Sequence, residues 1–368
     1  MDKLKRFIDC YIDTETCNLR CHYCYIALLE KFSQKLVKFP YSPETIARAL
    51  SKERLGGTCL FNLCAGGETL LSSEVLPVVC ALLREGHYVM VVTNGTITER
   101  FMEVEQFQPE FLKRLFFKFS FHYLELKRLG WMERFFENVK RVRDAGVSFT
   151  VEITPSDELV PYIDEIKQVC MEHLGTYCHI TIARDDRTDG IDVLSKYSWE
   201  KYKEIWSTFD SDLFSFKESI FYKRRTEFCY AGEWSVYVNL TTGHMKQCYC
   251  GLTLDNIYAN IEKPLHFKAI GCNCELAHCY NGHAFLTLGD IPGLDTVPYA
   301  QVRNRTDAEG REWLRHDMKE FLNQRLYDNN EEYDISQKEK VNREVKRKIT
   351  VKRKIIKALK IAKSVKRK

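Results

Sequence analysis

The first half of the chain alternates short apolar runs with amphipathic segments, and this alternation constrains the fold most. Six runs rich in valine, isoleucine, phenylalanine and tyrosine have the composition of strands: residues 6–13, 58–65, 87–94, 114–122, 147–155 and 178–184. Segments 42–55 and 133–146 between them read as helices, with Pro43 suited to a first helical turn and Gly146 to a C-terminal cap. Successive strand–helix units predict an α/β fold with a parallel sheet, either open or closed into a partial (β/α)6 barrel.

Polar motifs follow the predicted strands at their C-terminal ends. A C-x3-C-x2-C motif follows the first strand, Gly66-Gly67-Glu68 the second, residues 93–95 (TNG) the third and residues 120–123 (SFHY) the fourth. Active groups of parallel α/β sheets and barrels gather at this end, so we expect these motifs to lie close together. The two glycine motifs, taken singly, are also typical of ordinary loops.

Cysteine usage suggests metal or redox chemistry. The chain has 368 residues, enough for one large domain or two, and 15 of them are cysteines. No apolar segment approaches the roughly 20 residues of a membrane span, and the N-terminal apolar run is broken by Asp9 and Asp13, unlike a secretory signal. We therefore expect a cytoplasmic protein with reduced thiols. Cysteines outside the two cysteine groups described below are expected to pack as small apolar residues, although Cys64 beside the glycine motif could return a hydrogen atom to a substrate radical.

The C-x3-C-x2-C motif supplies three thiolates, Cys17, Cys21 and Cys24. Four thiolates close an iron–sulfur cube, whereas three leave one iron with open positions. Such an iron could bind a chelating amino group and carboxylate, such as the methionyl end of S-adenosylmethionine. The alternative is a zinc site completed by His22 or by a distant residue.

With these motifs in this order, the chain resembles the radical S-adenosylmethionine (radical SAM) superfamily over about residues 6–190. The resemblance implies a [4Fe–4S] cluster on the three cysteines, S-adenosylmethionine as cofactor, and an external electron donor such as flavodoxin or ferredoxin. It implies that Glu68 meets the methionyl ammonium, within a cofactor-binding set of Tyr23, Gly66, Gly67, Glu68, Ser120 and His122. At the later strands, Glu152 is the nearest match to the family's pattern. Arg184 could pair with a carboxylate of cofactor or substrate, or be a solvated loop residue, and His179 is expected on the surface.

A second cysteine group surrounds a predicted hairpin, in which residues 234–240 and 244–250 flank a TTG turn. Its members are Cys229, Cys248, Cys250, Cys272, Cys274 and Cys279. The pattern resembles the SPASM/twitch extension of radical SAM enzymes, which implies an auxiliary [4Fe–4S] cluster. Six thiolates cannot close two clusters, so we expect one, held by Cys229, Cys248 and Cys279 with Cys272 or Cys274 as the fourth ligand. A second, open cluster and a zinc site are the alternatives.

The chain ends in a basic segment. Residues 336–368 contain 15 Lys and Arg against two Asp and Glu, whereas the rest of the chain contains 40 against 49. Val341, Val345, Ile349, Ile356 and Leu359 recur near helical spacing, interrupted by Lys352. This pattern favours an interfacial helix on an anionic membrane surface, with a solvated tail as the alternative. Nucleic acid is not expected as a partner, because no aromatic residues interleave the charges.

The expected organisation is a barrel over 1–190, a helical linker over 191–228, a cluster domain over 229–290, a helical segment over 291–335 and the basic tail over 336–368. The family resemblance implies an oxidoreductase that cleaves S-adenosylmethionine to a 5′-deoxyadenosyl radical, which abstracts a hydrogen atom from its substrate. An auxiliary cluster that accepts an electron suits oxidation of a carbohydrate or polyol. Residues 278–293 resemble radical SAM proteins of bacterial surface-polysaccharide loci, which implies a small-molecule or glycan substrate. The basic tail predicts a place at the inner membrane face. The alternatives are a peptide- or protein-modifying maturase and a non-catalytic electron-transfer protein.

Overall fold

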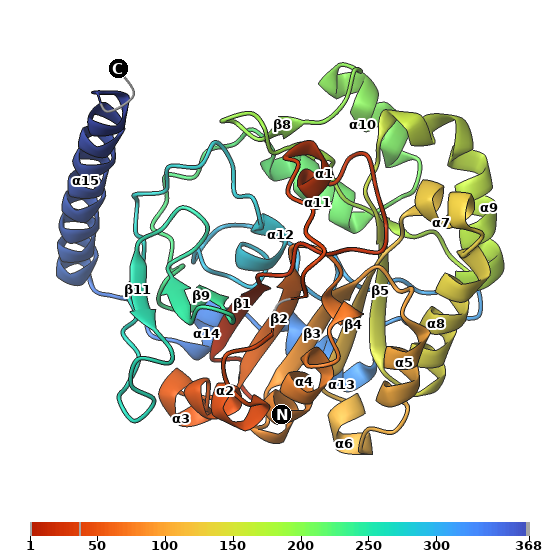
Figure 1. Cartoon of the computed structure of the whole chain (residues 1–368), viewed down its shortest axis with the longest axis horizontal. Helices are drawn as coiled ribbons and strands as arrows, with labels where there is room; N and C mark the ends of the chain where they lie inside the picture. Colours follow the sequence, from red (N-terminus) through yellow and green to blue (C-terminus); the bar gives the residue numbers. More distant parts are fainter. Residues whose placement is uncertain (1, 37, 366–368) are drawn as a thin grey trace.

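The computed structural model describes residues 2–36 and 38–365, with the side chains of 352 and of 355–365 left outside the description. Its centre is a nine-stranded sheet in the order β11-β10-β9-β1-β2-β3-β4-β5-β6 (Figure 1). Neighbouring strands from β1 to β6 pair in parallel. Their bounds are β1 Arg6–Ile12, β2 Cys59–Ala65, β3 Tyr88–Thr93, β4 Leu115–Ser120, β5 Ser148–Ile153 and β6 His179–Ile180.

Helices cover the outer face of this sheet, as the alternating sequence predicts. They are α2 Pro43–Ala49, α3 Lys52–Leu55, α4 Val75–Arg84, α5 Thr98–Val104, α6 Pro109–Leu112, α7 Tyr123–Leu129, α8 Met132–Asp144 and α9 Ile163–Leu174. Segment 42–55 forms two helices rather than one, because Ser51 accepts a hydrogen bond from the backbone N–H of Arg54 and starts α3. The expectation of a partial α/β barrel is confirmed.

The inner face of the barrel changes character along the strands. Near their N-terminal ends, Phe7, Leu60 and Phe116 join a buried apolar cluster with side chains of the C-terminal segment. Tyr88 stacks on Phe321 there, with ring centroids 3.6 Å apart. Two residues further along these strands, the side chains that point into the barrel are polar. Because the apolar layer closes the N-terminal end, the polar side chains face the end where the sequence motifs lie.

The sixth predicted strand is shorter than expected. The strand β6 ends at Ile180, and residues Arg184–Asp185 form β7, which pairs with β8 (Asp192–Val193) in a separate two-stranded sheet. The expectation that His179 lies on the surface is wrong. Its ring is buried and its nitrogens contact the Ser211 hydroxyl and the Asn304 carbonyl, both at 3.1 Å, because distant segments cover the end of the sheet.

The second half of the chain extends and closes the barrel. Helices α10 (Trp199–Ser207) and α11 (Asp212–Ile220) lie within 191–228, as expected, and α12 (Gly282–Phe285), α13 (His316–Asn323) and α14 (Leu326–Asn329) follow. The predicted hairpin is present as β9 (Ser235–Asn239) and β10 (His244–Lys246), with β11 (Thr253–Asn256) beside it. Strand β9 pairs in parallel with β1, so the hairpin is continuous with the barrel sheet. The five domain boundaries stay a prediction.

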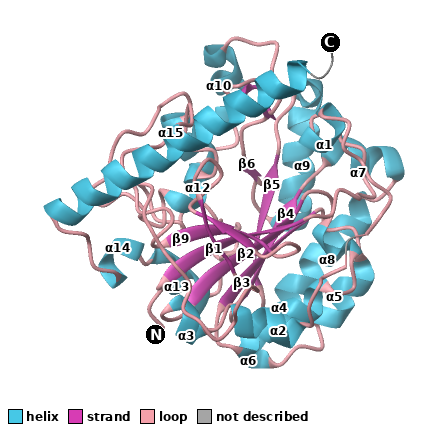
Figure 2. Cartoon of the chain, turned by 60° about the vertical axis from the view of Figure 1, so that its left-hand side comes forward, coloured by secondary structure: helices cyan, strands magenta, loops and turns pink. Residues whose placement is uncertain are grey.

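The basic tail is a helix, α15 (Ile335–Val365), which lies along the edge of the molecule (Figures 1 and 2). Val341 and Val345 are buried in the C-terminal core, and Ile349 packs against it. Lys268 pairs with Glu344 at 2.5 Å, and Glu275 pairs with Arg353. The first half of the tail is therefore docked and not solvated. The expected apolar positions Ile356 and Leu359, and Lys352, have side chains outside the described set. Among the described residues, no helix is long and apolar enough to cross a membrane.

Candidate metal and cofactor site

The cysteine loop lies against the glycine motif at the C-terminal ends of β1 and β2. The backbone N–H of Gly67 donates to the Thr14 carbonyl at 2.5 Å, and that of Glu68 donates to the Thr16 carbonyl at 3.0 Å. A Cβ atom on Gly67 would overlap the backbone of Thr16. The second position of the motif must therefore be glycine for the loop to pass this close. The loop then delivers Cys17 directly beside the motif.

All three cysteines of the loop border one pocket of about 90 Å³, together with Gly66, Gly67, Glu68 and other residues. Burial raises the pKa of the Cys17 thiol to about 11, and it raises the pKa of Cys21 and of Cys24 as well. Thiols of this kind stay protonated unless a metal replaces the proton. Three thiols from one short loop on one pocket fit an iron–sulfur cluster with three protein ligands.

Glu68 is almost fully buried, with 3% of its surface exposed, and its carboxylate is largely engaged. Oε1 accepts from the Thr93 hydroxyl at 2.6 Å and from the Leu70 N–H at 2.9 Å, and Oε2 accepts from the Asn94 N–H at 2.7 Å. Burial raises the pKa of this carboxyl, and the hydrogen bonds oppose that rise. A carboxylate offers about four acceptor positions, so these three hydrogen bonds leave one position on Oε2 open. Through its hydrogen bonds to Thr93 and Asn94, Glu68 links the loop after β2 to the end of β3.

Asn94 is a site residue that the sequence did not single out, because residues 93–95 were also typical of a loop. Its amide nitrogen donates to Asn18 Oδ1 at 2.8 Å and lies 3.8 Å from Cys17 Sγ. Its amide oxygen accepts from the hydroxyl of Thr96 at 2.7 Å. Asn94 thus joins the third strand end to the cysteine loop. Its position directly after a buried strand was the available signal.

The other expected cofactor residues also meet around this pocket. Ser120 and His122 line it, and the Tyr23 hydroxyl lies 2.7 Å from His122 Nδ1. Burial lowers the pKa of His122 to about 4, so its ring is neutral at pH 7. His22, the alternative zinc ligand, instead contacts Glu158 at 2.8 Å.

Cys64 is not the fully packed strand cysteine that was expected. It is half-buried and lines the pocket beside Gly66, because alternate β2 side chains point inward. Burial raises the pKa of its thiol to about 12.

Most of the second cysteine group lies together. The backbone N–H of Gly271 donates to the Cys229 carbonyl at 3.0 Å, which brings the 271–274 loop to the start of the hairpin segment. The sulfurs of Cys248 and Cys250 are 3.6 Å apart. Cys274 contacts Cys250 and is electrostatically close to Cys279, which makes five thiols available around one centre. This set fits a four-thiolate cluster.

Cys272 is set apart from the other five. Its side chain is exposed, and its sulfur accepts from the Asn342 amide on α15 at 3.6 Å. Among the described residues, no three His, Cys, Asp or Glu side chains are gathered as a ready site for a single metal ion. Of the two expected candidates for the fourth ligand, Cys274 is the one beside the other thiols.

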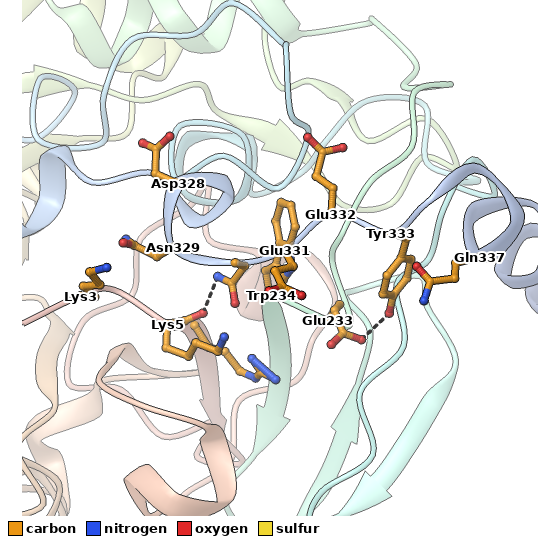
Figure 3. Close-up of a pocket in the computed structure, with 12 residues that line it drawn as sticks. Lys3, Lys5, Glu233, Trp234, Asp328, Asn329, Glu331, Glu332, Tyr333 and Gln337 are labelled. Carbon is orange, nitrogen blue, oxygen red and sulfur yellow. Dashed lines mark hydrogen bonds between the residues drawn. The ribbon is translucent and has the colours of Figure 1, made fainter.

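A larger hollow of about 600 Å³ lies away from the cysteines (Figure 3). Lys3 and Lys5 precede β1, so this hollow lies at the opposite end of that strand from the cysteine loop. Across it, the Tyr333 hydroxyl donates to Glu233 at 2.6 Å, and the Asn330 amide donates to the Lys5 carbonyl at 3.0 Å. This hollow is lined by both acidic and basic side chains and by no cysteine. It is larger than the cysteine pocket, but it lacks the thiols that a metal cluster needs.

Residues 11–157 match the family model described as "Radical SAM superfamily". No curated protein matches. Among solved structures, SuiB from Streptococcus suis bound to S-adenosylmethionine is 13% identical, with a TM-score of 0.49 over 70% of this chain and 65% of that chain. This chain thus spans less than two thirds of the SuiB chain. The chain called anSMEcpe with bound AdoMet is 15% identical, with a TM-score of 0.49 over 69% and 79%. BtrN in complex with AdoMet and 2-DOIA is 14% identical, with a TM-score of 0.32 over 70% and 80%.

Proposed function

The chain belongs to the radical SAM superfamily through residues 11–157, and on this premise we propose that it is an oxidoreductase that cleaves S-adenosylmethionine and oxidises a carbohydrate or polyol. One observation carries the proposal. The thiols of Cys17, Cys21 and Cys24 and the Gly66-Gly67-Glu68 motif border the same pocket, although β2 separates them in sequence. A cluster with one open iron and the methionyl end of the cofactor need this juxtaposition.

The residues of the pocket divide the binding tasks in this proposal. Cys17, Cys21 and Cys24 hold the [4Fe–4S] cluster, and the open acceptor position of Glu68 receives the methionyl ammonium. When bound, the cluster and the cofactor would supply the radical chemistry that removes a hydrogen atom from the substrate. The neutral His122 ring and the Ser120 hydroxyl face the same pocket and offer hydrogen bonds without added charge.

An auxiliary [4Fe–4S] cluster on the second cysteine group is the electron acceptor in this proposal. Cys229, Cys274 and Cys279 are three of its ligands. The fourth is Cys250 in place of the expected Cys248, because Cys250 contacts both Cys274 and Cys248, and Cys248 is the competing fifth thiol. A bound acceptor suits a net two-electron oxidation, because the substrate radical must lose a second electron.

A hydroxyl-rich substrate is favoured over a peptide by the inner face of the barrel. Next to the pocket this face carries polar and charged side chains, including Asp9, Asn62, Lys118 and Glu152. Such groups match the hydroxyls of a carbohydrate or polyol. The competing class is a peptide- or protein-modifying enzyme.

The test compares the reconstituted protein with a variant in which Cys17, Cys21 and Cys24 are all alanine. Under anaerobic conditions with a strong reductant, the unaltered protein should release 5′-deoxyadenosine from S-adenosylmethionine, and the triple variant should release none. The variant should keep about four iron atoms per chain on the second cysteine group, which shows that it is folded. Undiminished cleavage by the triple variant would overturn the proposal, and zinc in place of the retained iron would remove the electron acceptor.

A further inference from the structure

The inner face of the barrel gathers four basic side chains from four parts of the chain. Lys118 lies on β4, Arg184 on β7, Lys217 on α11, and Arg303 in the segment after α12. Lys118 and Arg303 both contact the carboxylate of Glu152, each at 2.7 Å. Lys217 donates to the Thr181 hydroxyl, and Arg184 donates to the Tyr280 carbonyl at 2.9 Å. We call these four residues the basic cluster.

The acids nearby do not balance this cluster. Glu152 is shared between two cations, and the ion pairs hold its pKa at about 2 although burial alone would raise it. Asp9 accepts only neutral hydrogen bonds, from Asn62 at 2.6 Å, Tyr249 at 2.7 Å and Asn281 at 3.0 Å. Burial raises the pKa of Asp9, and it also raises the pKa of Asp186 near Arg184. Within the described residues, neither Arg184 nor Lys217 has an ion pair.

Several buried polar atoms among these residues also lack hydrogen-bond partners within the part of the chain that is described. They include Nε and Nη2 of Arg303, whose side chain has no exposed surface, and Nδ1 of His283. Thr150 Oγ1 and Asn62 Oδ1, on inward positions of β5 and β2, share this property. Buried polar groups in native proteins are nearly always satisfied, so a concentration of polar atoms without partners in one place indicates a polar ligand.

The basic cluster lies beside residues that line the pocket of the cysteine site. Ser120 lines that pocket and pairs directly with Glu152 in the β4–β5 register. Cys64, another pocket residue, lies close enough to Lys118 for the lysine's charge to oppose the rise that burial causes in the pKa of the thiol. An oxyanion held by the cluster would therefore place the rest of its molecule beside the cysteine pocket.

We propose that the basic cluster binds an oxyanion of the substrate, a phosphoryl or carboxylate group carried by a polyol or sugar. This rests on the proposed function, because it takes the neighbouring pocket as the site of S-adenosylmethionine. Arg303 presents two open guanidinium nitrogens, and Lys217 adds a buried amine that has no ion pair among the described residues. Burial lowers the pKa of Lys217, so a bound oxyanion would favour its charged ammonium form. Guanidinium and ammonium groups together are the usual binders of phosphoryl and carboxylate oxygens.

The test measures binding of inorganic phosphate, and of acetate as a carboxylate probe, to the reconstituted holoenzyme by calorimetry, first without and then with saturating S-adenosylmethionine. Lys217→Met should weaken probe binding at least about tenfold, because the variant loses a hydrogen bond to a charged group. Lys217 has no ion pair among the described residues, so the substitution leaves no buried acid without its partner. Arg184→Gln is the second variant, should Lys217→Met fold poorly. Lys127→Met, which removes an exposed lysine paired with Glu165, is the matched control and should bind as the unaltered protein does.

The outcomes separate this inference from the function on which it rests. If neither probe binds, or if Lys217→Met binds as tightly as the control, the basic cluster is not an oxyanion site. If S-adenosylmethionine competes with the probes, the cluster serves the cofactor carboxylate and the substrate assignment is wrong. Failure of the unaltered protein to cleave S-adenosylmethionine would instead overturn the proposed function, while the binding data still decide the cluster.

Discussion

The Tyr23 hydroxyl and His122 Nδ1 lie 2.7 Å apart, so the cysteine loop is tied to the end of β4. Burial keeps the imidazole neutral and the phenol protonated, because it lowers the pKa of His122 to about 4 and raises that of Tyr23. A neutral phenol is the better donor of the two and an imidazole nitrogen the better acceptor. Tyr23 therefore donates to His122 when the ring proton of His122 resides on Nε2.

Tyr23→Phe removes this hydrogen bond and keeps the ring. If His122 orients toward the cofactor, the variant should lose about 1 kcal/mol of binding free energy for S-adenosylmethionine, which is an about fivefold weaker affinity. Iron content should not change, since Tyr23 is not a ligand. Equilibrium dialysis with the cofactor and iron analysis check both points. An unchanged affinity would mean that His122 plays no part in cofactor binding.

Gly67→Ala should displace the cysteine loop. The added Cβ would overlap the Thr16 backbone, which cannot move without shifting Cys17. We expect loss of the iron held by the first cysteine group and of 5′-deoxyadenosine formation. Gly293→Ala is the matched control, because a Cβ at that position meets nothing within 4 Å. It should cost only the local strain of its φ of +77°, about 1 kcal/mol, and keep the cluster. Equal iron loss in both variants would contradict the steric argument.

Cys274→Ser and Cys272→Ser should differ, although the two cysteines are separated by one residue. Cys274 contacts Cys250, whereas Cys272 is exposed and faces Asn342. In the background lacking the first cysteine group, Cys274→Ser should lower the retained iron, and Cys272→Ser should leave it near four atoms per chain. Iron analysis with Mössbauer or paramagnetic resonance spectra distinguishes these cases. Loss of iron only with Cys272→Ser would reverse the ligand assignment.

The basic tail can be shortened at a position that the structure defines. Truncation before Lys354 removes seven Lys and Arg and no acid, and it leaves every docked contact from Val341 to Arg353. If the tail binds anionic membranes, this variant should no longer float with phosphatidylserine vesicles at low salt, because each basic residue near such a surface contributes about 1 kcal/mol. Its thermal stability should not change. Failure of the full-length protein to float would exclude the membrane role.

Truncation before Ser336 provides the contrasting variant. It also removes Val341 and Val345, whose burial contributes about 1.5–3 kcal/mol each, and it exposes the core beneath them. This variant should therefore melt at a lower temperature than the one cut before Lys354. Equal melting temperatures would mean that the docking of α15 contributes little to stability.

The first half of the fold and the position of its site were readable from the sequence. Strand composition, helical periodicity and the loop motifs are local properties, and in a parallel sheet the strand order brings motifs at successive strand ends to one edge. This is why the cysteine loop, the glycine motif and Ser120 meet as expected. Two local errors have a local cause. Ser51 caps the N-terminus of α3, and this cap interrupts the helix that was expected to continue through it. In the apolar run 178–184, only His179 and Ile180 pair with the neighbouring strand β5.

Tertiary structure alone decided which distant side chains meet. Arg303 contacts Glu152, which lies 151 residues earlier in the sequence. Asn342 contacts Cys272, which lies 70 residues earlier. Strand β9 adds to the barrel sheet next to β1, with Phe7 opposite Ser235. Such contacts depend on how the C-terminal segments close the barrel, and the periodicity of any one segment carries no information about its partner. The cysteine spacing therefore predicted three thiols at one edge of the sheet, whereas the closure of the barrel by the C-terminal segments decided which charged side chains lie beside them.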